Sequence, residues 1–212
     1  MNRVLQKIRE NNKEFITSEE LRNYSKDLYY NYRIISNYLI SRKYLVKIFD
    51  DIYYVKTDDE IKQNVMKYPI LELVALALKH YNVKNWYYGL YTALDLINID
   101  YEHHDDFYYL INDRILKNKP VKILGKKFRF LGFKNDLFNF GIINDKIKYS
   151  DLEKTILDLV YLWEYNQKNE NRILIELSKL LDGSSEKILL EYSEFYPKST
   201  SNILKKALNK TN

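Results

Sequence analysis

Apolar positions along the first 56 residues follow first a helical period and then a strand-like one. Residues 2–11 carry apolar side chains at helical spacing and predict a first helix. Ser18 is a suitable N-cap and predicts a short second helix that ends near Ser25. A third helix is predicted over residues 30–43, where one inward-facing stripe consists of Ile35, Tyr38 and Leu39.

The segment after the third helix has the pattern of a tight β-hairpin. Residues 45–49 and 52–55 read as two strands, with Asp50-Asp51 as their turn. Helix, turn, helix and hairpin in this order predict an N-terminal winged helix-turn-helix over residues 1–60.

The charge pattern of this segment favours nucleic acid as a partner. No Asp or Glu occurs between Leu28 and Phe49, and a surface that meets phosphates must be poor in carboxylates. Arg33 and Asn37 fall on the outward face of the third helix and are suited to pairing with base edges. The alternative is a helical packing module with a solvated face. The predicted DNA-binding residues are Tyr30, Asn31, Arg33, Asn37, Ser41, Arg42, Lys43 and Lys47.

The remaining residues, 61–212, predict an α+β domain with a small antiparallel sheet between helices. We interpret Asp58, Asp59 and Glu60 as a solvated run at the junction. Helices are expected over residues 68–81 and 87–97. A long helix is expected to begin at Ser150, which would form a capping box with Glu153. Three further helices are expected after it, and the last ends near Asn209. The strands are expected at residues 107–111, 121–124, 127–133, 138–143 and 146–149, with a turn at Gly125-Lys126.

Composition narrows the possible classes of function. The formal charge of +5 permits nucleic acid as a partner, and the absence of Cys excludes disulfides and thiolate chemistry. The longest apolar run, near residues 70–78, contains Glu72 and is too short to span a bilayer. The N-terminus has no apolar signal region. We therefore expect a cytoplasmic protein without a membrane partner.

The sequence contains no motif that indicates an enzyme. Phosphate-binding glycine loops, HExxH and GxSxG are absent. The run His103-His104-Asp105-Asp106 is a candidate metal site, but consecutive residues rarely converge on one ion, so a solvated loop is the preferred interpretation. His80 is placed at a helix end, where a partly positive imidazole suits the carbonyl groups. We expect no catalytic residue, no cofactor and no metal.

Three stretches together resemble the AbiEi antitoxin family. The first is the predicted winged helix. The second, at residues 86–94, reads WYYGLYTAL, and the third, at residues 149–158, reads YSDLEKTILD. The resemblance extends to about residue 165. It implies the antitoxin of a type IV toxin–antitoxin pair in antiviral defence, which represses its own operon through the winged helix. It also implies a functional link to a nucleotidyltransferase-like toxin.

Two alternatives remain open beside this interpretation. A stand-alone winged-helix regulator without a toxin would share the architecture. A protein-interaction module would use aromatic anchors at Trp86, Tyr87, Tyr88 and Tyr91, although these residues can equally form a core.

We further expect double-stranded operator DNA with paired half-sites, occupied by two or more molecules. Residues after Tyr68 would supply their contact or a second basic surface, with Lys198, Lys205, Lys206 and Lys210 as the candidates.

Overall fold

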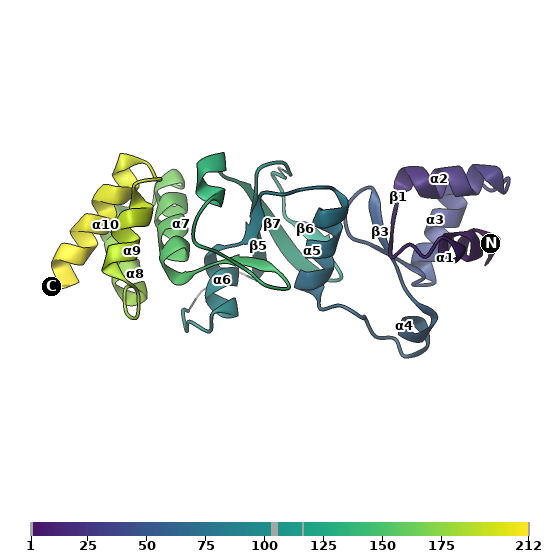
Figure 1. Cartoon of the computed structure of the whole chain (residues 1–212), viewed down its shortest axis with the longest axis horizontal. Helices are drawn as coiled ribbons and strands as arrows, with labels where there is room; N and C mark the ends of the chain where they lie inside the picture. Colours follow the sequence, from purple (N-terminus) through teal and green to yellow (C-terminus); the bar gives the residue numbers. More distant parts are fainter. Residues whose placement is uncertain (1, 103–105, 116, 212) are drawn as a thin grey trace. The chain divides into compact units, whose positions relative to one another are not determined.

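The computed structural model describes residues 2–102, 106–115 and 117–211 (Figure 1). The chain divides into two compact units, which we call unit 1 and unit 2. Unit 1 contains residues 1–82 and 123–125, and unit 2 contains residues 83–122 and 126–212. The functional boundary predicted near residue 60 falls within unit 1.

Unit 1 begins with three helices and a three-stranded antiparallel sheet. The sheet order is β1-β3-β2, so β3 is its central strand. Two further helices follow, α4 and α5, and His80 is the last residue of α5, as predicted. The bounds of the elements are α1 Asn2–Glu10, β1 Phe15–Thr17, α2 Ser18–Asp27, α3 Tyr32–Ser41, β2 Leu45–Lys47, β3 Ile52–Val55, α4 Asp58–Lys62 and α5 Ile70–His80.

The start of α2 differs from the sequence prediction. Thr17, not Ser18, is the N-cap: its side chain accepts from the Glu20 N–H, and the Glu20 carboxylate accepts from the Thr17 N–H at 2.8 Å. This reciprocal capping box fixes α2 directly after β1, a strand that the sequence did not predict. The helix then runs to Asp27, beyond the end predicted near Ser25.

The interpretation of Glu60 as part of a solvated run is wrong. The side chain is buried and accepts hydrogen bonds from the Tyr54 hydroxyl at 2.9 Å and the Lys67 N–H at 2.7 Å. It also completes a capping box with Thr57 at the start of α4. Burial alone raises the pKa of Glu60, but these backbone and hydroxyl donors outweigh burial and hold the pKa below its ordinary value.

Unit 1 should therefore lose stability in acid through Glu60. A carboxyl whose pKa is lowered by folding stabilises the protein above its unfolded pKa, and that contribution disappears as the pH falls through the folded pKa. Glu60→Gln is expected to cost about 1–3 kcal/mol near neutral pH and to flatten the acid dependence. Urea unfolding by circular dichroism, between about pH 3 and about pH 7, measures this change. An unchanged acid dependence in the variant would contradict it.

Unit 2 combines a mixed sheet with helices, so the chain is α+β as predicted. The predicted antiparallel sheet is wrong in type, because β5 pairs with β7, and β4 with β9, in parallel. Within the described residues the sheet has six strands in the order β6-β7-β5-β4-β9-β8. Their bounds are β4 Trp86–Tyr88, β5 Phe107–Asn112, β6 Val121–Ile123, β7 Lys126–Gly132, β8 Ile142–Asn144 and β9 Lys148–Ser150.

Two local predictions in this unit are also wrong. The helix predicted over residues 87–97 is a buried strand, β4, followed by the shorter helix α6, Leu90–Leu96. Gly89 lies at this junction and close to β5, since a Cβ there would lie 2.5 Å from the Ile111 Cδ1 atom. Ser150 lies in β9, and Asp151 caps the following helix by accepting from the Lys154 N–H at 2.8 Å.

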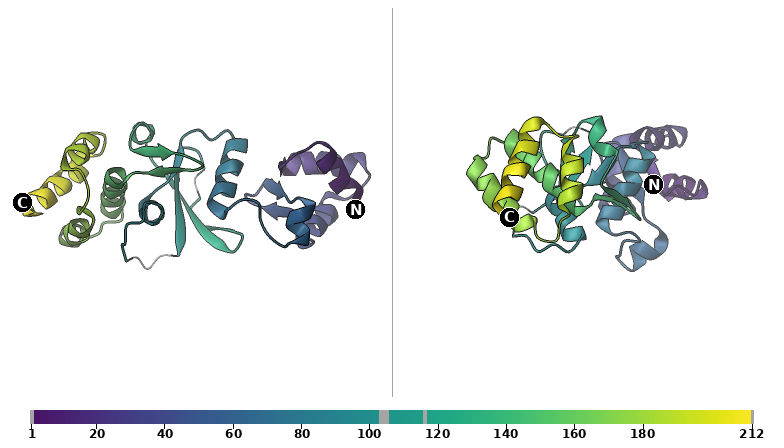
Figure 2. Two further views of the ribbon diagram at one scale, coloured as in Figure 1. Left: turned by 60° about the horizontal axis from the view of Figure 1, so that its bottom comes forward. Right: turned by 60° about the vertical axis from the view of Figure 1, so that its left-hand side comes forward.

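Four helices complete unit 2 and pack side by side, as Figure 1 and Figure 2 show. The first of them, α7, contributes a buried face that includes Ile156, Val160 and Trp163. Ser185 caps α9, as predicted. The short helix η1, Asn135–Phe138, precedes β8. The four helices are α7 Leu152–Tyr165, α8 Glu170–Leu180, α9 Glu186–Ser193 and α10 Lys198–Thr211.

Candidate functional site

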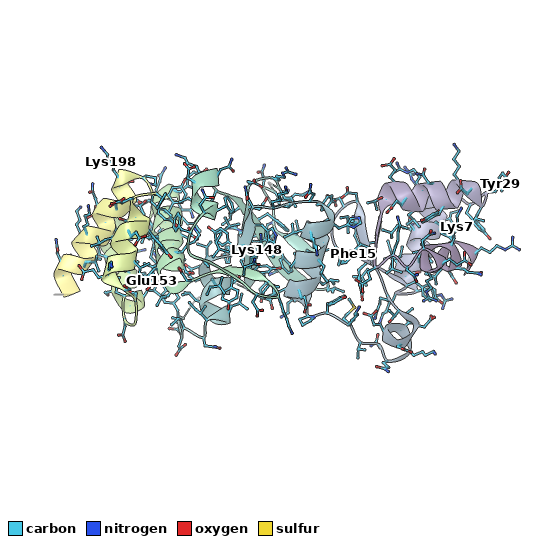
Figure 3. All side chains as sticks on the ribbon, in the orientation of Figure 1. Lys7, Phe15, Tyr29, Lys148, Glu153 and Lys198 are labelled. Atoms are coloured by element: carbon cyan, nitrogen blue, oxygen red, sulfur yellow. The ribbon has the colours of Figure 1, made fainter. Side chains whose placement is uncertain are left out.

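The turn between α2 and α3 is set by local hydrogen bonds. Tyr29 adopts a left-handed conformation with φ of 59°, and the Tyr30 N–H donates to the Ser25 carbonyl at 2.8 Å. Asn31 then caps α3, because its side-chain oxygen accepts from the N–H groups of Arg33 and Ile34. The Tyr29 side chain, 98% exposed, extends from the surface at this turn (Figure 3).

Helix α3 presents one face to solvent and one to the core. Ile35 and Leu39 are buried against the other helices of unit 1, whereas Tyr38 is only half-buried. Arg33, Asn37 and Ser41 are all exposed and recur every four residues, which places them along a single outer face. Ile34, 62% exposed, adds an apolar side chain beside them. The exposed face thus offers one cation, one amide, one hydroxyl and one apolar group.

A second group of side chains surrounds the hydroxyl of Tyr32. Partial burial alone raises the pKa of Tyr32, but hydrogen bonds with Ser18 and Tyr53 and the charges of Arg22 and Lys47 lower it. The Arg22 guanidinium lies 4.8 Å from the centre of the Tyr32 ring. Two exposed cations from α2 and β2 are therefore gathered near one phenol. We call Arg22, Tyr32 and Lys47 the basic cluster.

Sequence reasoning missed Arg22. Its only local signal is its position four residues after Ser18, on the same face of α2. The placement of Arg22 and Lys47 near Tyr32 is a tertiary feature that residue spacing does not encode.

Several predicted DNA-binding residues have structural partners. Asn31 is the helix cap, and half-buried Tyr30 packs against the core. The Lys43 ammonium donates to the Asn64 side-chain oxygen at 3.2 Å. Exposed Arg42 follows the last residue of α3, and its positive charge there is stabilised by the negative end of the helix dipole.

Lys47 has a neighbour of opposite charge. Its ammonium lies 3.3 Å from the Asp50 carboxylate in the turn of the β2–β3 hairpin. Asp50 and Asp51 are both exposed there. Because these carboxylates would repel phosphate, Lys47 is the better candidate contact of the hairpin and the turn itself a poor one.

The two sequence motifs of unit 2 meet in space. The WYYGLYTAL segment forms β4 and α6, and the YSDLEKTILD segment forms the end of β9 and the start of α7. Tyr88 of β4 pairs in parallel with Tyr149 of β9. The Tyr87 hydroxyl donates to the Asp158 carboxylate at 2.9 Å. Both motifs therefore belong to one structural unit.

A buried ion pair lies at the centre of this unit. The Lys154 ammonium is 3.6 Å from the Asp158 carboxylate, and neither side chain is exposed. The Tyr196 hydroxyl also donates to Asp158, at 2.5 Å. The ammonium faces the rings of Tyr87 and Phe140 at 4.8 and 4.5 Å. Burial raises the pKa of Asp158 and lowers the pKa of Lys154. We call Tyr87, Lys154, Asp158 and Tyr196 the buried charge cluster.

The aromatic side chains considered as interface anchors belong mainly to the core. Trp86, Tyr87 and Tyr88 are buried, and Tyr91 is half-buried. The alternative of a protein-interaction module required these aromatic side chains to be exposed, and most of them are not.

The predicted loop at His103–Asp106 mostly lies outside the described residues, which include only exposed Asp106. Among the residues that the structure does describe, no group of metal-ligating side chains converges. No helix in this described part is both long and apolar enough to cross a membrane.

The four lysines predicted to form a second basic surface are all exposed. They are Lys198, Lys205, Lys206 and Lys210, and the Lys206 ammonium lies 2.7 Å from the Glu170 carboxylate.

Comparison with known proteins bears on the fold alone. No family model matches the sequence, and no curated protein matches it significantly. Among solved structures, the chain is similar to the RV2827C protein from Mycobacterium tuberculosis, with a TM-score of 0.53 and 9% sequence identity. The match covers 98% of this chain and 75% of that chain.

Proposed function

We propose that the chain is a DNA-binding transcriptional regulator in which α2, α3 and the β2–β3 hairpin act as a winged helix-turn-helix. The observation that carries this proposal is the outer face of α3. It bears Arg33 and Asn37, both exposed, in a stretch of chain without a carboxylate between Leu28 and Phe49. Arg pairs with guanine and Asn with adenine in the major groove, which is wide enough to admit one helix.

The basic cluster supports the same proposal. A helix that enters the groove needs cations on flanking elements to hold its register on the phosphates. Arg22 from α2 and Lys47 from β2 supply such cations near the Tyr32 hydroxyl. In this proposal Arg33 and Asn37 read bases, whereas Arg22 and Lys47 contact the backbone.

The second part of the proposal is that the regulator is an autorepressing antitoxin of a type IV toxin–antitoxin pair. It rests on the resemblance to the AbiEi family at residues 86–94 and 149–158. The hydrogen bond between Tyr87 and Asp158 supports it, because it joins the two motifs in one folded unit. A nucleotidyltransferase-like reading frame next to this gene would distinguish the antitoxin from a stand-alone regulator.

A gel-shift series on the DNA upstream of the protein's own gene tests the regulator proposal. We expect binding that is stronger to this DNA than to scrambled DNA of equal length and that weakens with rising salt, because bound cations release counterions from the phosphates. Equal affinity for the two DNAs, or affinity independent of salt, would contradict sequence-specific binding.

Arg22→Gln should weaken binding to operator and to scrambled DNA by the same factor. A phosphate contact carries no sequence information. Its loss should reduce the slope of log affinity against log salt concentration, the salt slope, by about one. Arg3→Gln is the matched control, since Arg3 is an exposed arginine on α1 that lies outside the basic cluster. An effect of Arg22→Gln on the operator alone would assign Arg22 to base reading instead.

A further inference from the structure

A basic segment that the DNA-binding proposal does not use lies mostly in unit 2. Residues 114–135 contain eight Lys or Arg residues and no Asp or Glu, whereas the whole chain has a formal charge of only +5. Strand β7 within this segment has a buried face with Phe128 and Phe130 and exposes Lys127 and Arg129. Such a concentration of cations is the electrostatic signature of a surface that meets a polyanion.

An open pocket of about 430 Å³ lies where β7 approaches the end of α7. Arg129 and Phe133 line it from the strand side, and Tyr161 and Tyr165 from the helix. Lys117 adds a second cation, and no lining residue is acidic. The pocket thus combines cations with aromatic rings inside unit 2.

The aromatic side chains of the pocket differ in how firmly they are held. Tyr161 packs edge-on against Phe133, with 5.2 Å between ring centres, and forms a fixed wall. Tyr165, the last residue of α7, is 79% exposed. A large aromatic ring left in solvent beside cations is available for stacking on a planar ligand.

We propose that this pocket binds single-stranded nucleic acid, with a base stacked on Tyr165 and the adjoining phosphates near Arg129 and Lys117. Single-stranded chains expose both the base faces and the phosphates that this combination recognises. In a duplex the bases are stacked on each other and cannot stack on Tyr165. Only the phosphate contacts of Arg129 and Lys117 would then remain. The site is independent of α3 and of the DNA-binding proposal.

Fluorescence anisotropy with labelled single strands of about a dozen nucleotides tests the site. The full chain would carry Arg33→Ala and Asn37→Ala, so that α3 does not contribute. We expect RNA or DNA single strands to bind more tightly than a duplex of equal length, and the preferred strand identifies the source of the ligand. Tyr165→Ala should weaken binding about 10-fold, because one stacked base is lost. Arg129→Gln should also reduce the salt slope by about 0.7.

Matched controls separate the pocket from general surface effects. Phe195→Ala removes another exposed aromatic ring of unit 2, and Lys187→Gln removes an exposed cation of α9. Both should leave single-strand affinity unchanged, and melting temperatures verify that every variant folds. Three results would overturn the proposal: equal affinity for the duplex, unchanged affinity in Tyr165→Ala, or displacement by polyglutamate as effective as by unlabelled RNA. None of them would affect the regulator proposal, which the operator gel shift tests separately.

Discussion

Asp158→Ala should destabilise unit 2 by about 3–5 kcal/mol, the cost of leaving one member of a buried ion pair without its partner. The variant removes the carboxylate that accepts from Tyr87 and Tyr196 and leaves the Lys154 ammonium among aromatic rings. Urea unfolding followed by tryptophan fluorescence measures the loss. Both tryptophans, Trp86 and Trp163, lie in unit 2, so the signal reports this unit alone.

A double-mutant cycle separates the ion pair from general damage to the core. Lys154→Met/Asp158→Ala should be less destabilising than the sum of the two single variants, because neither charge is then left unpaired. Asp182→Ala, at an exposed aspartate after α8, is the control and should change stability by less than about 0.5 kcal/mol. Strict additivity in the cycle would show that Lys154 and Asp158 do not act as a pair.

Arg33→Ala/Asn37→Ala should reduce operator affinity by roughly 100-fold or more, while binding to scrambled DNA changes far less. Each base-contacting side chain contributes about 1–3 kcal/mol of discrimination. Both side chains are exposed on α3, so the fold should survive their removal. Titration of operator and scrambled DNA at one fixed salt concentration gives the ratio of the two affinities directly.

The matched control for this variant lies in unit 2. Arg172→Ala/Asn202→Ala removes the same two residue types from exposed positions on α8 and α10. It should preserve the ratio of operator to scrambled-DNA affinity. A double variant at Arg33 and Asn37 that retains this ratio would show that α3 does not read the bases.

Short-range patterns were sufficient to predict much of unit 1. The apolar spacing placed α1 and α3, an expected cap at Ser18 placed α2, and the Asp50-Asp51 turn placed the β2–β3 hairpin. The exact caps were missed by one residue at Thr17 and Asp151, because either of two adjacent polar residues could cap the helix. Glu60 was misread because its partners, Tyr54 and Lys67, are set by tertiary packing.

Unit 2 shows where such patterns fail. Trp86–Tyr88 directly precedes a true helix, and its strand conformation comes from pairing with β5 and β9, which the local pattern does not contain. The parallel pairing of β5 with β7 requires a connection through β6, which local sequence does not reveal. The pocket beside Tyr165 combines residues from β7 and α7 that are more than 25 positions apart in the sequence. Its charge signal, the acid-free segment at residues 114–135, was present in the sequence and overlooked.

The most direct test of the central claim is methylation interference on the DNA upstream of the protein's own gene. Methylation at guanine N7 blocks the major-groove position where an arginine makes its paired contact. If α3 reads the operator, methylation of specific guanines in each half-site should prevent binding of the wild-type protein. Arg33→Ala should lose this sensitivity at one guanine per half-site. Binding that tolerates methylation of every guanine, or an interference pattern unchanged in Arg33→Ala, would contradict the assignment of Arg33 to guanine recognition by α3.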